Sequence, residues 1–365
     1  MPKKVDKIFL ISFLALLICG FLVFISASLG IYARDNAKFT SIIFNQTFLG
    51  LFMGLIACFI ASRINYKIWR KFSFYIFLLS VLTSLLVFVP GVGISHGGAS
   101  RWIYIFGVSF QPLEFLKIGF IIYFASWISG MKDKIRTFKY GLLPFLVLTG
   151  IIGAILLKQP DTDSFIIIFI VGLAMFIIGG GKWRHLFLII ILSLIGISAL
   201  FLIRPYLLDR LATFIHPDQN ALTSSYQIQQ SLIAVGSGEI FGRGFGQSIQ
   251  KFKFLPESIG DSIFPIAAEE FGFIGSVFII FLFIFFMSRG LRIANQAPDV
   301  LSRLLVIGIV ILITIQSFLN IASMIGVLPL SGSPLIFFSQ GGTALFFTLI
   351  EIGIIINVSR FKKIN

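Results

Sequence analysis

The sequence predicts an all-α polytopic membrane protein with about ten transmembrane helices. Hydrophobic residues fill 57% of its 365 positions and charged residues only 12%, which leaves too little polar surface for a water-soluble chain of this length. The apolar residues gather in segments close to the roughly 20 residues that a helix needs to cross the hydrocarbon core. The formal charge of +14 comes from short basic clusters between these segments. This pattern is typical of membrane topology, so nucleic acid is excluded as a partner.

The predicted spans follow one another along the chain and leave one long segment between the seventh and the eighth. The first apolar run continues to about Ile31, which is too long for the hydrophobic region of a signal peptide and predicts a retained helix. We expect one membrane domain over residues 1–365, with a large loop at 204–262 between helices 7 and 8. The spans are predicted at residues 8–31, 41–62, 71–90, 113–130, 141–157, 164–181, 185–203, 263–288, 302–326 and 335–358.

The loops alternate in charge, and this alternation predicts the orientation. Clusters such as Arg63–Lys71 and Lys132–Lys139 put most of the 29 basic residues into one set of loops. By the positive-inside rule, both termini are expected in the cytoplasm. The 204–262 loop is then extracytoplasmic, with Asp261 at its end.

Four glutamates lie in or at the predicted spans: Glu114, Glu269, Glu270 and Glu351. Ionisable groups there are costly and mark functional sites by default. The alternative is a structural ion pair, such as Glu114 with Lys117 at spacing i, i+3. Adjacent Glu269 and Glu270 point about 100° apart around a helix, so they need separate partners.

Asp261 is interfacial rather than buried in a span. Pro256 and Gly260 disfavour helix before it, so its carboxylate is expected on a turn that leads into the helix starting near Ile263. One interpretation is an N-cap that satisfies free backbone N–H groups. The other is a general base with access to both water and lipid headgroups. Position alone favours the cap.

Several polar clusters are also expected on the outer face. Arg101, within Gly97–Trp102, suits a phosphate or diphosphate group, although an arginine that snorkels to headgroups is the alternative. Gln159-Pro160-Asp161 and Ser339–Gly342 combine helix ends with Pro and Gly, where broken backbone can line a cavity. No disulfide or metal pattern is recognisable in the cysteines and histidines, which are Cys19, Cys58, His96, His185 and His216.

Five stretches occur in a fixed order: GASRWI at 98–103, FQPLEFLK at 110–117, QPD at 159–161, the long run at 226–275, and PLIFFSQGG at 334–342. Together they closely resemble the SEDS family, the shape, elongation, division and sporulation group that includes FtsW, RodA and SpoVE. The resemblance covers nearly the whole chain, and the 226–275 stretch is its most specific part. The segments IGVLPLSGSPLIFF and IEIGIIINVSR lean toward the division-type, FtsW-like branch.

The resemblance implies a peptidoglycan glycosyltransferase in the bacterial cytoplasmic membrane. Such enzymes polymerise lipid II, the undecaprenyl-diphosphate-linked disaccharide, at the outer face, for cell division or cell shape. The implied partners are a class B penicillin-binding protein, which crosslinks the strands, and other divisome or elongasome membrane proteins. Asp261 falls on the family's essential acidic position, which reverses the preference for a simple cap.

On this hypothesis Asp261 deprotonates the acceptor hydroxyl, and a cation stabilises the leaving diphosphate. Arg101 and Lys117 are the first candidates for the cation, followed by Arg243 and Lys251. A divalent cation, Mg²⁺ or Mn²⁺, could share this task, although no ligand cluster in the sequence demands one. The remaining site predictions are Glu114, Glu257 and Gln340 as substrate contacts, and Glu269, Glu270 and Asp161 as structural or secondary residues.

The chain departs from the family pattern at several positions. Ile259 and Gly260 stand where a His-Thr pair usually precedes the catalytic Asp, and Gln340 stands where a Tyr is usual. Asp163 occupies a position at which the resemblance leads us to expect Gly.

Two other functions remain open from the sequence. A lipid II flippase would also suit ten helices with Lys117, Glu269 and Glu270 inside the membrane. A catalytically idle scaffold would need only to recruit the crosslinking partner, although an intact Asp261 argues against it. Polymerisation in detergent separates enzyme from flippase, because no membrane remains to be crossed.

Overall fold

The computed structural model describes residues 5–33, 35–96, 99–105, 108–215, 224–252 and 254–361. Within these ranges, eight helices are long and apolar enough to cross a membrane, and two shorter apolar helices, Thr162–Ile178 and Trp183–Gly196, accompany them. Each of the ten predicted spans therefore has a helix, and the all-helical polytopic fold is confirmed. Three positions named above lie outside the described ranges: Gly97, Gly98 and His216.

The chain enters the bundle through a long first helix, which is followed by a second span, Asn36–Arg63, whose middle is π-helical. The first-half helices are α1 (Lys7–Tyr32), α2 (Asn36–Phe44), the π-helical η1 (Asn45–Met53), α3 (Gly54–Arg63), α4 (Tyr66–Leu86), α5 (Pro112–Met131), the short η2 (Lys132–Arg136) and η3 (Phe138–Leu142), and α6 (Leu143–Lys158). The second-half helices are α7 (Thr162–Ile178), α8 (Trp183–Ile203), α9 (Pro205–Ile215), α10 (Ser224–Ser237), η4 (Gln250–Phe252), α11 (Ile263–Asn295), α12 (Val300–Met324) and α13 (Gly342–Ser359).

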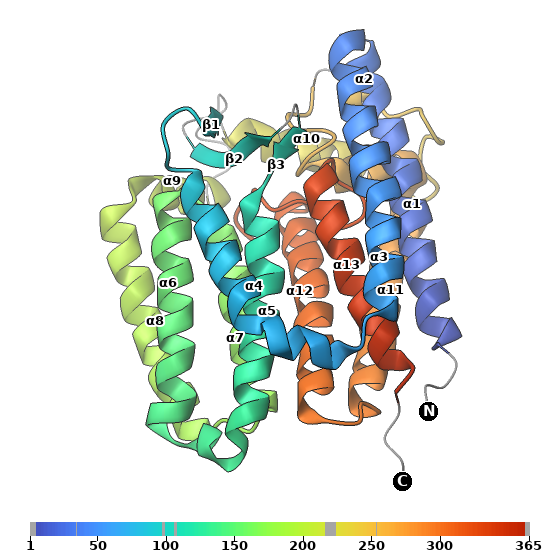
Figure 1. The fold of residues 1–365 in the computed structure, drawn as a ribbon. Coiled ribbons are helices and arrows are strands. Elements are labelled where there is room, and N and C mark those ends of the chain that lie inside the picture. The colour runs from blue at the N-terminus through green and yellow to red at the C-terminus, as the bar shows by residue number, and fades with distance from the viewer. Residues whose placement is uncertain are drawn as a thin grey trace.

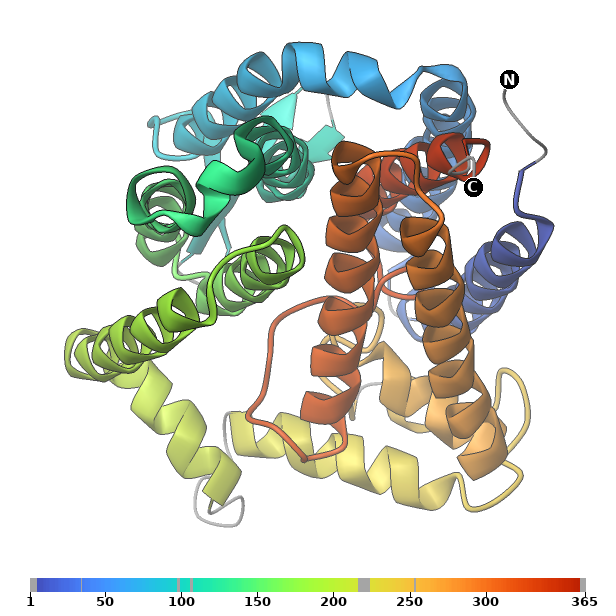
Figure 2. The same ribbon diagram turned by 90° about the horizontal axis from the view of Figure 1, so that it is seen from below.

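The centre of the bundle is made by α5, α12 and α13, whose side chains are mostly buried. Small residues let α3 and α13 approach closely, because a β-carbon added at Gly353 would lie 2.5 Å from the carbonyl oxygen of Cys58. Such small-residue contacts are a usual way for helices to associate within a bilayer. In contrast, α8 lies at the edge of the bundle in both views (Figures 1 and 2).

The start of α1 and the end of α13 lie on the same side of the bundle. Asp6, the N-cap of α1, accepts a hydrogen bond of 2.9 Å from Nη2 of Arg289, and its backbone N–H donates to Oγ of Ser359 at 3.4 Å. Helix α13 therefore begins at the opposite end, where the strands and α10 also lie (Figure 1). The candidate site is at that opposite end.

Three features of the opposite end differ from the sequence predictions. The 93–110 stretch forms an antiparallel sheet of β1 (Gly93–His96), β2 (Ala99–Ile105) and β3 (Val108–Phe110), with Ile103 facing both Gly93 and Phe110 across the strands. The segment predicted as a loop at 204–262 contains the helices α9 and α10.

The last span begins later than predicted, at Gly342 rather than residue 335. The backbone before it is turned away from helix, with Phe337 at φ 71°. Its polar groups make contacts with other segments instead of an i→i−4 ladder, for example from the N–H of Gln340 to the carbonyl oxygen of Ile259 at 2.7 Å.

Helix α11 is broken at Gly272, which has φ 66° and ψ −164°. The carbonyl oxygens of Glu269 and Glu270 accept hydrogen bonds from the N–H groups of Arg243 and Gly244, each at 3.0 Å, instead of from the following turn. The freed N–H groups of that turn, at residues 273 and 274, donate to the carbonyl oxygens of residues 239 and 240. The glycine-rich loop, residues 238–246, thus satisfies the backbone hydrogen bonds that the helix break leaves open, as membrane-embedded backbone requires.

We expect Gly242→Ala to destabilise this junction. Gly242 has φ 81°, and a β-carbon there would lie 2.2 Å from the carbonyl oxygen of Glu270. The left-handed backbone alone costs roughly 1–2 kcal/mol for a residue with a side chain, so the thermal unfolding midpoint in detergent should fall. Gly236→Ala is the matched control, because it lies in α10 with no atom within 4 Å of the added carbon. Equal midpoints for the two variants would contradict the prediction.

Candidate active site

Asp261 lies on a tight turn directly before α11. The carbonyl oxygen of Glu257 accepts hydrogen bonds from the N–H of Gly260 at 2.9 Å and of Ser262 at 3.1 Å. The N-cap of α11 is Ser262, which makes no side-chain capping bond. No described residue donates a hydrogen bond to the Asp261 carboxylate. The capping interpretation is therefore wrong, and this partly exposed carboxylate is available to another molecule.

The loop between α12 and α13 is tied to the Asp261 turn. Asn320, fully buried on α12, donates from Nδ2 to the carbonyl oxygens of both Asp261 and Ser333, each at 2.8 Å. Oγ of Ser339 donates to the carbonyl oxygen of Gly260 at 2.7 Å. These bonds hold the backbone of Asp261 from two sides and leave its carboxylate free.

Gln340, predicted as a substrate contact, is exposed beside this turn. Only its backbone N–H has a described role, donating to the carbonyl oxygen of Ile259 at 2.7 Å. Glu257 is also exposed, at φ 48°, and shapes the turn through its carbonyl oxygen. Both side chains therefore face outward next to Asp261.

The pKa of Asp261 is set by burial and by charges from four segments. The pKa is raised to about 7: burial of the carboxyl group is the largest cause, and the negative charges of Glu257 and Asp163 act in the same direction. The positive charges of Arg101 and Arg210 lower it. A carboxyl group with a pKa near 7 is about half ionised at neutral pH, which suits a general base.

Arg101, on β2, reaches the QPD turn. Its Nη2 donates to the carbonyl oxygen of Pro160, its Nε donates to that of Gln159 at 3.4 Å, and Nε lies 3.9 Å from Oδ2 of Asp161. Asp161 in turn caps α7 by accepting from the N–H of Ser164 at 3.3 Å. Arg101 thus fixes the turn and keeps its positive charge near Asp261.

Two residues that the sequence analysis did not assign complete this group. Asp163, on the first turn of α7, pairs with Nη1 of Arg210 on α9 at 3.0 Å, and its Oδ2 also accepts from the N–H of Gly332 at 2.9 Å. Asp163 could have been suspected, because it follows Asp161 at a helix start and replaces an expected Gly. Nothing in the sequence distinguishes Arg210 from the other basic residues of its segment.

Lys117, predicted as a diphosphate contact, lies within the bundle. Its Nζ binds Oε1 of Glu114 at 2.8 Å and Oε1 of Gln316 at 2.9 Å, and both charged side chains are buried. The i, i+3 ion pair offered as the structural alternative is therefore present. Glu351 on α13 is also buried, and the charges of Glu114 and Lys117 act on it electrostatically.

Lys251 and Arg243 pair with the two adjacent glutamates. Nζ of Lys251 lies 2.8 Å from Oε1 of Glu270, with both side chains fully buried, and Arg243 lies 3.6 Å from Oε1 of Glu269. The requirement for separate partners is thus confirmed. Among the described charges, those that act on Asp261 include neither of these cations.

No cluster of three His, Cys, Asp or Glu side chains in the described ranges could hold a metal ion. We therefore assign no ligands to a divalent cation among the described residues.

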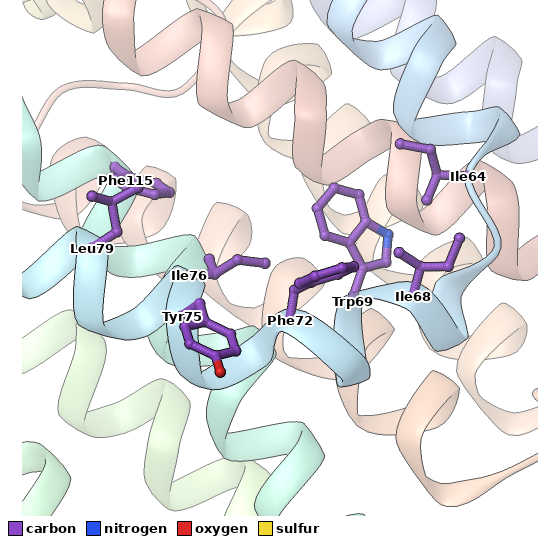
Figure 3. A pocket seen from close by; sticks show the side chains of 8 residues that line it. All are labelled: Ile64, Ile68, Trp69, Phe72, Tyr75, Ile76, Leu79 and Phe115. Atoms are coloured by element: carbon purple, nitrogen blue, oxygen red, sulfur yellow. The ribbon is translucent and has the colours of Figure 1, made fainter.

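A hydrophobic groove of about 360 Å³ lies along α4 (Figure 3). Its lining combines aromatic and aliphatic side chains, and only Tyr75 and Trp69 carry a polar atom. The lining residues are Ile64, Ile68, Trp69, Phe72, Tyr75, Ile76, Leu79 and Phe115. The lining contains no carboxylate, amine or imidazole group.

Comparison with known proteins gives matches over almost the whole chain. Residues 6–364 match the FTSW_RODA_SPOVE family, described as cell cycle protein. Stage V sporulation protein E of Bacillus subtilis (strain 168) is 35% identical over 360 residues, covering 98% of both chains. A probable peptidoglycan glycosyltransferase FtsW of Geobacter metallireducens is 38% identical over 311 residues, covering 85% of this chain and 83% of the relative.

Solved structures share the fold. One solved structure carries the description "Structural coordination of polymerization and crosslinking by a peptidoglycan synthase complex". It matches with a TM-score of 0.80 and 25% identity over 98% of each chain. The Rod shape determining protein RodA of Thermus thermophilus matches with a TM-score of 0.71 and 25% identity, over 99% of this chain and 98% of its own. The chain therefore belongs to the FtsW/RodA/SpoVE family, the SEDS family.

Proposed function

We propose that this protein is a peptidoglycan glycosyltransferase that polymerises lipid II, with Asp261 as its general base. The relatives named as peptidoglycan glycosyltransferases support the reaction class. One observation carries the assignment of the base: the partly exposed Asp261 carboxylate accepts no hydrogen bond from the described residues. Its pKa, raised to about 7 with burial as the largest cause, agrees with this role.

In the proposed reaction, Asp261 takes the proton from the 4-hydroxyl group of an acceptor N-acetylglucosamine. The oxygen forms a bond to the anomeric carbon of the growing chain's muramyl residue, and the bond from that carbon to undecaprenyl diphosphate breaks. The electron pair leaves with the diphosphate, and the α-linked donor becomes a β-linked product. Product release then lets Asp261 return its proton to water.

Arg101 and Arg210 are the proposed cations near the leaving diphosphate, because both act electrostatically on the Asp261 carboxylate. Lys117 and Lys251 are better assigned to structure, since each is buried in an ion pair with a glutamate. The groove along α4 offers an apolar surface for a polyprenyl chain (Figure 3).

We place the site at the extracytoplasmic face of the bacterial cytoplasmic membrane, with both termini cytoplasmic, because of the loop charges. A class B penicillin-binding protein is the proposed partner, supported by the similar structure of a complex that coordinates polymerisation with crosslinking. A flippase is disfavoured because the buried charges that suited it, at Lys117, Glu269 and Glu270, are held in pairs with other residues.

The test is the pH dependence of lipid II polymerisation by the purified protein in detergent, with a class B partner added. The active form of the base is deprotonated, so activity is lost as pH falls through a pKa of about 7. The initial rate should rise about tenfold between pH 6 and pH 8. Absence of product at every pH, from folded protein with its partner, would favour transport. Product with a flat profile would remove Asp261 as the base.

A further inference from the structure

The carboxylates of Asp163 and Asp261 both lie close to Gly332. A β-carbon built on Gly332 would lie 3.6 Å from Oδ2 of Asp261 and 3.8 Å from Oδ2 of Asp163. The N–H of Gly332 donates to Oδ2 of Asp163 at 2.9 Å. The α12–α13 loop therefore lies against two carboxylates: Asp163 accepts a hydrogen bond from its backbone, and Asp261 accepts none from the described residues.

Arg210 holds Asp163 in this arrangement. Its Nη1 lies 3.0 Å from Oδ2 and 3.3 Å from Oδ1 of Asp163, while both side chains stay partly exposed. The contact crosses from α9 to α7 and joins the segment after α8 to the loop before α13. The same loop is also held by Asn320, whose Nδ2 donates to the carbonyl oxygens of Ser333 and Asp261.

The pair also contributes opposite charges next to Asp261. The charged groups that act on this carboxylate come from four elements: Glu257 from its own turn, Asp163 from α7, Arg101 from β2 and Arg210 from α9. Oδ2 of Asp161, the N-cap of α7, lies 3.9 Å from Nε of Arg101. Removing Asp163 or Arg210 thus changes the charge balance at Asp261 in opposite directions.

We propose that Asp163 and Arg210 are a positioning pair for Asp261, fixing the 331–333 loop beside its carboxylate and setting the charge balance there. The proposal rests on Asp261 acting as the base. A pair that only braced the loop would alter the rate without moving the pH at which activity appears. A pair that sets the charge balance moves that pH, and each member moves it differently.

The experiment compares pH–rate profiles of lipid II polymerisation for Asp163→Asn, Arg210→Gln and the wild type, with the class B partner. Asp163→Asn keeps an oxygen that can accept from Gly332 but removes a negative charge. Its midpoint should fall by roughly 0.5–1 pH unit. Arg210→Gln removes a positive charge, so its midpoint should rise by a similar amount.

Two further variants sharpen the comparison. Arg210→Lys retains the charge and should keep the wild-type midpoint, although the guanidinium that contacts both Asp163 oxygens through Nη1 is replaced. Arg184→Gln, exposed at the start of α8, is the matched control for removal of a positive charge and should shift nothing. Equal shifts in one direction for both pair variants, or no shift in either, would overturn the positioning role. If Asp261→Asn retained full activity, the failure would instead lie in the proposed base.

Discussion

Asp261→Asn is expected to lower the rate of lipid II polymerisation by about 10²–10⁴-fold, the range that general-base catalysis contributes. Asparagine has nearly the same shape but cannot take up the acceptor's proton. The turn should persist, because its bonds use the backbone of Asp261, including the 2.8 Å contact to Nδ2 of Asn320. The measurement is the initial rate in detergent, with the purified class B partner present at saturating concentration.

Protein folding should not account for this loss. Replacing a carboxyl group whose ionised form is disfavoured by burial removes a desolvation penalty. The thermal unfolding midpoint of Asp261→Asn should therefore equal or exceed that of the wild type at pH 8. Asp133→Asn, exposed in η2, is the control for the same chemical change and should retain wild-type activity. A rate for Asp261→Asn within twofold of wild type would exclude Asp261 as the base.

The transmembrane helices could be predicted from the sequence because each is encoded locally. About 20 consecutive apolar residues define a span whatever surrounds them, and ten such segments correspond to helices in the described structure. The helix break at Gly272 has no such local signature. It exists because residues 239–244 return to the same helix and supply the missing hydrogen bonds.

The sheet at 93–110 and the helices α9 and α10 were missed for a related reason. Residues 102–106 are an aromatic and β-branched run typical of a strand, but the run is only five residues long, and periodicity alone does not distinguish so short an apolar run from a helix segment. Helix α10 contains several polar residues and packs on α11, so its stability comes from a neighbour rather than from its own hydropathy. Elements at the membrane surface therefore depend on contacts that one sequence does not reveal.

The candidate site likewise contains some residues that the sequence reveals locally and others that only contacts between distant segments bring together. Asp261 and Arg101 could be singled out because each carries chemistry in a motif. The pairing of Asp163 with Arg210 joins positions 47 apart in the chain, and no spacing rule connects them. Lys117 shows the converse error: a lone cation in a span looks available to a ligand, whereas in the structure Glu114 and Gln316 already bind it.

Lys251→Met is expected to destabilise the protein by about 3–5 kcal/mol, the effect of removing one partner from a buried ion pair. Lys251 is among the largest fully buried side chains, and its Nζ contacts Oε1 of Glu270 at 2.8 Å and Oγ of Ser26 at 3.1 Å. Without this cation, the Glu270 carboxylate stays buried with Ser26 as its nearest described donor, at 2.6 Å. The measurement is thermal unfolding in detergent, together with the fraction of protein that remains monodisperse.

The double variant Lys251→Met/Glu270→Gln distinguishes a lost ion pair from lost packing. It removes both charges, and replacing a buried pair by uncharged groups of similar volume is often close to neutral. We therefore expect it to recover more than half of the stability lost in Lys251→Met. Lys67→Met, exposed at the start of α4, should change stability by less than about 0.5 kcal/mol. A double variant less stable than the single one would mean that Lys251 acts through its packed side chain and its contact with Ser26. The glycine-rich loop would then be anchored to α1 by shape rather than by charge.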